Sequence, residues 1–291
     1  MSLTRHLRCA RSPVRQFFNA IIDDQAARAL VREANDRAAL AAWQRGGLLR
    51  VSGTIPALAG MAYDFGFRDW VQPFSLEEPP RVALHGAHCA SAVGWPNALP
   101  LLADVLRLLP KTSGLTRARC YLVLAVCEQF HRAFGSIVAR REDAGDNLPA
   151  QMLADPPTSL IGLLARMPDA TVRDVAALLD DTRHRWPALR DQPFVPNPIF
   201  PLSAQIGGAD ADWVRGGVLQ ECKVSAVQRP VAGAHLRQLL GYLLLDTDDA
   251  LGIEAVGLFL PRQGAQIAWA VPMFLHRLLS ITHKSTHPPL W

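Results

Sequence analysis

The chain has 291 residues, of which 49% are hydrophobic and 19% are charged, and its formal net charge is +4. This composition excludes a disordered, collagen-like or coiled-coil protein, and the length suits one large domain or two smaller ones. The apolar runs, such as residues 239–245, are far shorter than the roughly 20 residues that span a membrane. We therefore expect a globular protein.

The cysteine content points to a reducing compartment. There are five cysteines, an odd number, and they show no paired spacing. The first residues also lack the pattern of a secretory signal. We expect a cytoplasmic protein.

Positive charge is concentrated in two stretches. Residues 1–22 carry four arginines and no acidic residue, and residues 101–141 carry seven basic residues against Asp104 and Glu128. Each stretch is either a solvated helix face or a surface that faces phosphates.

The first two thirds of the chain are expected to be mostly helical. Residues 1–50 show helical periodicity, and an apolar helix is predicted from about Pro56 to Trp70. A further helical stretch covers roughly 95–190. Four prolines within residues 193–201 then predict an extended connector that no helix crosses.

The pattern changes after residue 199. Residues 212–225 alternate around Gly216–Gly217, which predicts a strand hairpin. A helix is expected from about Ala232 to Asp246, followed by strands in 253–260 and 265–271. A last helix is expected over about 272–281. The predicted order is therefore strand, strand, helix, strand, strand, helix.

The hairpin carries the residues with the clearest chemistry. Because side chains alternate along a strand, Glu221 and Lys223 point to the same side and Cys222 points to the other. Asp212 lies one short hairpin upstream and is expected beside Glu221. Two such carboxylates suit Mg²⁺ or Mn²⁺, and the lysine could orient or deprotonate a water that attacks a phosphoryl group. The alternative is an ordinary surface ion pair.

Lys223 is notable because lysine is rare in this chain. Only three of the thirty basic residues are lysines, namely Lys111, Lys223 and Lys284. A lysine in such a chain is expected where the wide fork of arginine cannot replace a compact ammonium. Lys223 also lies within an otherwise apolar strand, where an unpaired charge is costly.

Three segments together resemble the PD-(D/E)xK nuclease superfamily, and within it the RecB-type branch. The segment "DADWVRGGVLQECK" matches the acidic residue, hairpin and (D/E)-x-K, with Asp212, Glu221 and Lys223 in those places. Asp210 is a neighbouring acid, but Asp212 is the better match to the acidic residue of the family, because apolar strand residues directly follow it. The segment "QLLGY" supplies Gln238 and Tyr242 of the Q-x-x-x-Y helix motif.

The third segment, "GMAYD", resembles the first motif of that branch. Asp64 stands where the branch has a metal-binding histidine, and a carboxylate is still a plausible oxygen ligand. The resemblance covers about 57–72 and 199–272, roughly a third of the chain.

The resemblance implies an α/β fold with a restriction-endonuclease-like core, a mixed central sheet flanked by helices. Residues 1–56 would form a helical N-terminal segment. Residues 57–291 would form the nuclease-like domain, with its core in 57–72 and 199–291 and a helical insertion in 73–198.

The implied activity is Mg²⁺- or Mn²⁺-dependent hydrolysis of DNA phosphodiesters, in DNA repair or phage defence. Asp64, Asp212 and Glu221 would bind the metal, and Lys223 would position the water and stabilise charge at phosphorus. Gln238 and Tyr242 would hold the site or the phosphate backbone. The stretch 101–141 would contact the DNA backbone.

DNA is the expected partner, a protein partner in a repair or defence complex is a further expectation, and no membrane is expected. Two alternatives to the nuclease function stay open. One is a catalytically silent nucleic-acid-binding or scaffold module of the same fold, and the other is an unrelated α/β protein with a surface hairpin. The sequence also leaves open whether cleavage would be endo- or exonucleolytic, whether the substrate is DNA or RNA, and what the oligomeric state is.

Other sites have weaker signals. His85, His88 and Cys89, with Cys127 and His131, look like parts of a zinc site, but neither spacing is a strong zinc signature. The chain lacks the phosphate-binding loop of ATPases and helicases. It also lacks a cysteine cluster after the core, so an iron–sulfur cluster is not expected.

Overall fold

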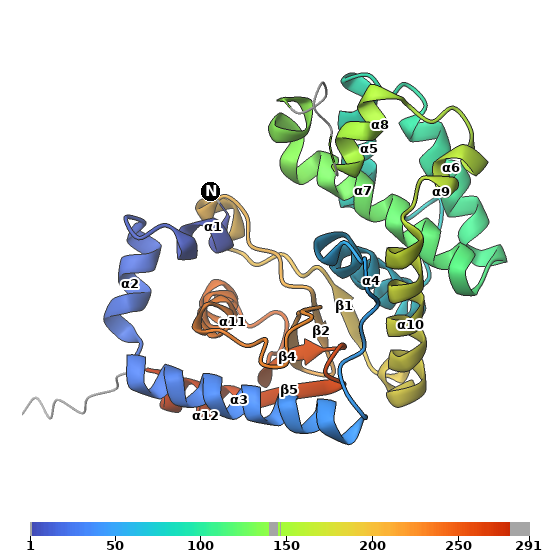
Figure 1. Ribbon diagram of the computed structural model, residues 1–291. Helices are drawn as coiled ribbons and strands as arrows, with labels where there is room; N and C mark the ends of the chain where they lie inside the picture. Colours follow the sequence, from blue (N-terminus) through green and yellow to red (C-terminus); the bar gives the residue numbers. More distant parts are fainter. Residues whose placement is uncertain (1, 140–144, 146, 280–291) are drawn as a thin grey trace, which may run out of the picture. The chain divides into compact units, whose positions relative to one another are not determined.

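The computed structural model describes residues 2–139, 145 and 147–279 (Figure 1). Its internal contacts divide the chain into two compact units. Unit 1 comprises residues 1–47, 193–223 and 227–291. Unit 2 comprises residues 48–192 and 224–226.

Unit 1 contains a five-stranded mixed sheet in the order β1-β2-β3-β4-β5. Strands β3 and β4 are parallel, and the other neighbouring pairs are antiparallel. A parallel pair needs a crossover connection, and helix α11 (Gly233–Leu245) supplies it. The strands are β1 (Phe194–Pro196), β2 (Trp213–Arg215), β3 (Val218–Cys222), β4 (Ala255–Leu260) and β5 (Ala265–Ala270).

The hairpin between β2 and β3 has a two-residue turn at Gly216 and Gly217, whose φ angles are +52° and +74°. Glycine adopts positive φ without the steric cost that a Cβ atom imposes, and two positive values suit the twist of a tight hairpin. Trp213 pairs with Gln220 in the register of this hairpin. Continued by one residue, the same register sets Asp212 opposite Glu221.

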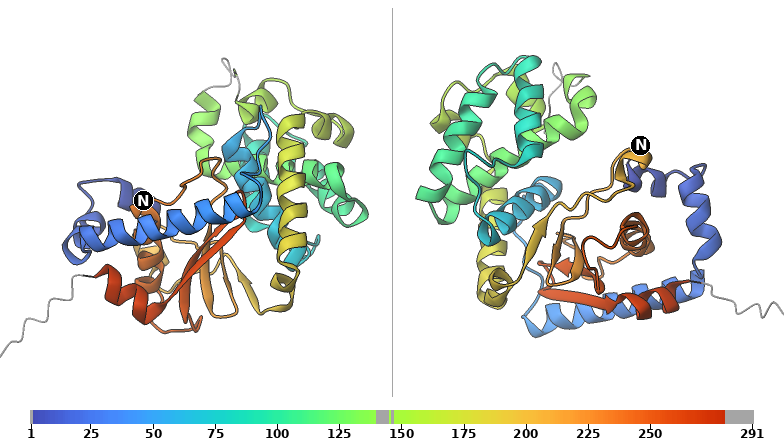
Figure 2. Two further views of the ribbon diagram at one scale, coloured as in Figure 1. Left: turned by 60° about the horizontal axis from the view of Figure 1, so that its bottom comes forward. Right: turned by 180° about the vertical axis from the view of Figure 1, so that it is seen from behind.

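Helices cover this sheet and build the core of unit 1. They are α1 (Leu3–Arg8), α2 (Pro13–Ile21), α3 (Asp24–Gln44), α11 and α12 (Val271–Leu278), with a short 3₁₀ helix, η3 (Ser203–Ile206). Helix α3 packs against β5 and α11 (Figure 2). The shared core includes Leu30, Ala34, Leu219, Leu236, Leu239, Leu240, Leu258, Ile267 and Trp269. Burying each large side chain of this kind contributes about 1.5–3 kcal/mol.

A buried amide fixes the approach to α11. Asn35 of α3 donates to the carbonyl of Val231 and accepts from the N–H of Val231, both at 2.9 Å. Buried polar groups without such partners are costly, so this pair holds the segment before α11 in one place.

Unit 2 consists of helices in the part of the chain that the structure describes. They are α4 (Pro56–Val71), α5 (Arg81–Ala92), α6 (Ala98–Leu108), η1 (Leu109–Lys111), α7 (Gly114–Ala139), α8 (Leu148–Ala154), α9 (Leu160–Ala165), α10 (Asp169–Arg185) and η2 (Pro187–Asp191). Helix α7 packs against α4, α5 and α10. Asp69 ties α4 to α7, because it accepts from Tyr121 Oη at 2.6 Å and from Arg117 at 2.9 Å.

Among the described helices, α7 is the one long and apolar enough to cross a membrane by length and composition. Half of its most apolar stretch is buried within the protein, as in the core helix of a globular unit. The described residues therefore contain no clear membrane span, and the predicted cytoplasmic location stays a prediction.

Several predictions from the sequence are confirmed. The chain is α/β, with a mixed sheet and many helices, and the helix at 56–70 and the order of elements after residue 199 are as expected. The last helix ends at Leu278, and the predicted residues 280–281 lie outside the described part. Strand β1 was not predicted. The restriction-endonuclease-like core stays a prediction.

The two compact units differ from the sequence-based division in where they place α4. That division grouped residues 57–72 with the sheet and residues 1–56 apart. In the structure α4 groups with the other helices of 48–192, because it packs on α7 and α10, whereas residues 1–47 group with the sheet.

Candidate functional site

Four of the predicted site residues meet at one end of β3 and along α11. Glu221 Oε1 accepts from Lys223 Nζ at 2.5 Å and from Gln238 Nε2 at 2.8 Å. Gln238 Nε2 also donates to Tyr242 Oη at 2.6 Å. Gln238 and Tyr242 reach the same place because residues four apart share one face of a helix.

The carboxylate of Glu221 is almost fully buried, with 5% of its side chain exposed, whereas Lys223 keeps 24%. Burial lowers the pKa of Lys223, but the negative charges of Glu221 and Asp212 outweigh it and raise that pKa above its ordinary value. Lys223 is therefore an ammonium ion at neutral pH in this arrangement. It can donate hydrogen bonds and stabilise negative charge.

Asp212 lies beside this group. Its Oδ2 accepts from the backbone N–H of Cys222 at 2.6 Å, which fixes the carboxylate next to the strand that carries Glu221. Its charge also acts on Lys223 and Tyr242. Asp210 is different, because its side chain is exposed and its backbone carbonyl accepts from Tyr242 Oη at 2.9 Å.

Tyr242 completes a chain of contacts that runs from Glu221 through Gln238 to the carbonyl of Asp210. Burial and the charges of Glu221 and Asp212 raise the pKa of Tyr242 strongly, so its hydroxyl keeps its proton and can donate. Phe200 stacks on the ring of Tyr242 with 5.3 Å between ring centroids. Gln238 and Tyr242 thus hold Glu221 in one orientation.

His235 is a member of this site that the sequence did not indicate. It lies one turn before Gln238 on α11, and its Nδ1 accepts from the N–H of Ala232 at 3.2 Å. Burial lowers the pKa of His235 to about 4, and the positive charge of Lys223 contributes to this. The imidazole is therefore neutral at neutral pH. The sequence did offer one signal: His235 lies three residues before Gln238, and residues three apart share one face of a helix.

Asp64 belongs to unit 2, in α4, and forms an ion pair with Arg68 one turn further along that helix. Its predicted role as a metal ligand beside Asp212 and Glu221 stays a prediction. Across residues 2–139, 145 and 147–279, no group of three or more His, Cys, Asp or Glu side chains is gathered as a metal site would require. His85 and His131, two of the residues considered for a zinc site, lie with ring centroids 5.7 Å apart.

Asp212 and Glu221 are nevertheless suitable ligands for Mg²⁺ or Mn²⁺. Both ions prefer carboxylate oxygens, and Mg²⁺ is often bound through one or two carboxylates together with water and substrate phosphate. A carboxylate has about four acceptor positions, so Glu221 can accept from Lys223 and Gln238 and still bind a cation.

The basic stretch 101–141 is largely neutralised by acidic partners. Arg107, Arg117, Arg119 and Arg132 form ion pairs with Asp104, Asp69, Asp169 and Glu128, respectively. Lys111 is exposed, and Arg140 and Arg141 lie outside the described residues. The unbalanced positive charge of this stretch is therefore smaller than its residue count indicates.

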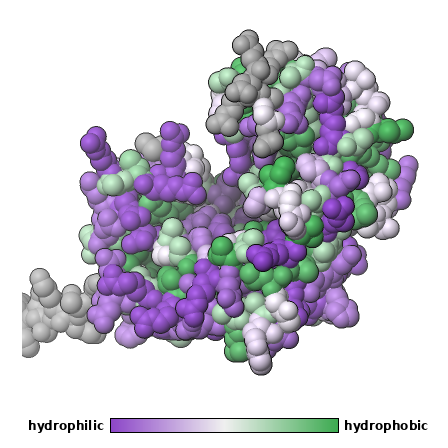
Figure 3. Space-filling model, viewed as in Figure 1, coloured by the Kyte–Doolittle hydropathy of each residue, from purple (hydrophilic) through white to green (hydrophobic). Residues whose placement is uncertain are grey.

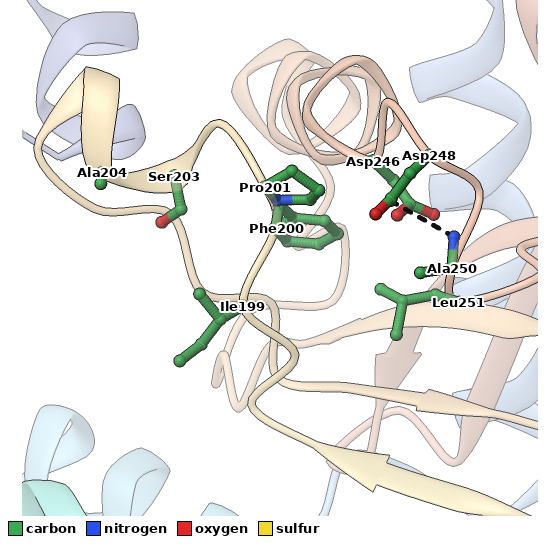
Figure 4. Close-up of a pocket in the computed structure, with 9 residues that line it drawn as sticks. All are labelled: Ile199, Phe200, Pro201, Ser203, Ala204, Asp246, Asp248, Ala250 and Leu251. Atoms are coloured by element: carbon green, nitrogen blue, oxygen red, sulfur yellow. Dashed lines mark hydrogen bonds between the residues drawn. The ribbon is translucent and has the colours of Figure 1, made fainter.

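A pocket of about 480 Å³ adjoins the site through Phe200 (Figure 4). Asp246 and Asp248 lie side by side at its edge, at the end of α11, and apolar groups of Phe200, Pro201 and Leu251 face them. Burial and the nearby charges of Asp248 and Asp249 raise the pKa of Asp246. The paired carboxylates repel anions, so this pocket does not suit a nucleic-acid phosphate.

Comparisons of the chain with models of protein families, with curated proteins and with solved structures found no match.

Proposed function

We propose that this protein is a divalent-metal-dependent nuclease that hydrolyses phosphodiester bonds of DNA. One observation carries the proposal: Glu221, Lys223, Gln238 and Tyr242 are joined by hydrogen bonds, and Asp212 is set opposite Glu221 in the hairpin register. These five residues occupy the places that the resemblance to PD-(D/E)xK nucleases assigns to catalysis. An ordinary surface ion pair would not require Glu221 to be buried and held by a second element.

Asp212 and Glu221 would hold Mg²⁺ or Mn²⁺ in this proposal, with Asp64 as a further candidate. When bound, such a cation supplies positive charge to the phosphate and lowers the pKa of a bound water. The protein's own contribution is to hold the two carboxylates in fixed orientations. The Cys222 N–H fixes Asp212, and Lys223 and Gln238 fix Glu221.

Lys223 is assigned two roles in this proposal, to orient the attacking water and to stabilise negative charge. As an ammonium ion paired with Glu221, it would orient the attacking water by hydrogen bonding and stabilise the negative charge that builds on the phosphate oxygens. Stabilisation of developing charge by a donor already in place is usually the largest single contribution to such a reaction.

Gln238 and Tyr242 are positioning residues in this account. Gln238 holds Glu221, and Tyr242 holds Gln238 through a hydroxyl that is itself tied to the carbonyl of Asp210. Groups that orient a metal-binding carboxylate in this way typically contribute 10–100-fold to activity or metal affinity, as an order of magnitude.

The test is DNA cleavage with the full chain in Mg²⁺, Mn²⁺ or EDTA, on linear and on circular DNA. Wild-type protein is expected to cut in either metal and not in EDTA, and the circular substrate separates endonuclease from exonuclease action. Glu221→Gln is expected to abolish cutting. Glu254→Gln, an exposed glutamate preceding β4, is the matched control and is expected to cut normally. Equal cutting by all three proteins would overturn the proposal.

A further inference from the structure

The N-terminal helices of unit 1 carry unbalanced positive charge. Residues 2–22 contain Arg5, Arg8, Arg11 and Arg15, which we call the arginine surface, and no acidic residue. Helix α3 of the same unit is balanced, with three arginines (Arg28, Arg32, Arg37) and three acidic residues (Asp24, Glu33, Asp36). In Figure 3 hydrophilic residues lie over much of α2 and α3 with apolar residues among them, so hydropathy does not distinguish the two helices, whereas their net charge does.

Three members of the arginine surface are solvent-exposed. Arg5 and Arg8 lie three residues apart on α1, whose other face buries Leu3 and Leu7, and Arg11 precedes α2. Their side chains form no ion pair with the described residues. This differs from the stretch 101–141, where four of the arginines are paired with carboxylates.

Arg15 is the fourth member and also a structural residue. Its Nη1 donates to the carbonyl of Leu7 at 2.7 Å and so ties α2 to α1. Arg237 of α11 lies near it, only 15% exposed and 3.6 Å from Asp24. Burial and the nearby Arg15 charge lower the pKa of Arg237, and Asp24 opposes this. Arg15 therefore adds a second positive charge near the Arg237–Asp24 ion pair, beside α11.

The arginine surface is attached to the segments that carry the candidate site. Leu3 packs over Gly241, where a Cβ atom would lie 2.7 Å from a methyl carbon of Leu3. Gly241 directly precedes Tyr242. The N–H of Leu3 donates to the carbonyl of Gly208 at 2.8 Å, four residues before Asp212. Helix α1 is therefore anchored to α11, which carries Gln238 and Tyr242, and to the segment that leads to Asp212.

We propose that the arginine surface binds the phosphate backbone of the DNA that enters this site. The inference rests on the proposed nuclease function for the identity of its substrate. Arginine contacts to phosphates release counterions, so binding depends on salt and not on base sequence. The surface would hold the strand while Asp212, Glu221 and Lys223 act on it.

The experiment measures binding of a fluorescein-labelled DNA duplex by fluorescence anisotropy over a series of salt concentrations, in EDTA so that the duplex is not cut. The test variant is Arg5→Ser/Arg8→Ser/Arg11→Ser, which leaves the structural Arg15 in place. The matched control is Arg28→Ser/Arg32→Ser/Arg37→Ser on α3, which removes the same net charge from the same unit.

The test variant is expected to bind about tenfold or more weakly. Its plot of log affinity against log salt is expected to be less steep by about 2–3, because each phosphate contact contributes roughly 0.9 to the slope. The control is expected to keep the wild-type slope. Equal losses in both variants, no loss in either, or no binding by the wild type would overturn the inference.

Two further readouts separate this inference from the proposed function. Wild-type protein that binds the duplex through the arginine surface but does not cut in Mg²⁺ would support the inference and contradict the nuclease. A test variant that cuts and binds DNA as the wild type does would contradict the inference alone. Loss of binding to phosphatidylserine vesicles with unchanged DNA binding would identify a membrane surface instead and overturn the inference.

Discussion

Gln238 Nε2 donates to Glu221 Oε1 at 2.8 Å and so links a helix to a strand that lies 17 residues earlier in the chain. The same nitrogen contacts the hydroxyl of Tyr242 at 2.6 Å. One amide thus orients a buried carboxylate and is itself fixed by a buried phenol.

Removing the amide is expected to affect catalysis more than folding. Gln238→Leu keeps the size of the side chain but removes the amide that donates to Glu221, so we expect kcat to fall about 10–100-fold with little change in KM. Steady-state DNA cleavage measures both constants. Gln44→Leu, at the exposed end of α3, is the control. A change confined to KM would contradict the positioning role.

Removing the hydroxyl of Tyr242 is expected to affect stability. Tyr242→Phe leaves the amide of Gln238 and the carbonyl of Asp210 without this partner, which is expected to cost about 1–2 kcal/mol of the free energy of unfolding. Urea denaturation followed by circular dichroism measures this cost. A variant as stable as the wild type would show that the hydroxyl does not hold the site together.

Stability is expected to depend on pH through His235. Its pKa is lowered from 6.5 to about 4 by burial and by Lys223, so the unfolded chain takes up a proton in a range where the folded protein does not. The contribution of neutral His235 is therefore present above pH 6.5 and is lost as the pH falls toward about 4, by up to roughly 3 kcal/mol. His235→Gln should lose less stability than the wild type between these pH values. Parallel curves for the two proteins would exclude this role.

Much of the candidate site could be predicted from the sequence because its contacts are local. The alternation of a strand sets Glu221 and Lys223 on one side, the two-glycine turn sets Asp212 opposite Glu221, and the helical repeat aligns Gln238 with Tyr242. Each relationship spans one hairpin or one helical turn, so the pattern fixes it.

Features that depend on distant segments could not be predicted. Arg117 and Arg119 find acidic partners 48 and 50 residues away, so a count of charges overstated the basic character of 101–141. The packing of Leu3 on Gly241 joins opposite ends of the sequence. Strand β1 was missed because it ends in Pro196 within a proline-rich stretch, and an edge strand tolerates a residue that cannot donate to the sheet.

Metal binding should distinguish Asp212 from Asp210. A cation that binds only the folded protein raises its stability by mass action, by about 2.7 kcal/mol at a hundredfold excess over Kd. We expect Mn²⁺ to raise the Tm of the wild type and of Asp210→Asn, and not that of Asp212→Asn. Differential scanning fluorimetry with and without Mn²⁺ measures this. The opposite result for the two variants would assign the metal to Asp210.

The central claim is that Lys223 is the cation of a nuclease site, and the most direct test is metal-dependent DNA cleavage by Lys223→Ala beside Lys111→Ala. Lys111 is an exposed lysine outside the site and changes the net charge by the same amount. The account predicts that the wild type and Lys111→Ala cut DNA in Mg²⁺ and stop in EDTA, while Lys223→Ala folds but does not cut. Undiminished cutting by Lys223→Ala, or no cutting by the wild type in either Mg²⁺ or Mn²⁺, would contradict it.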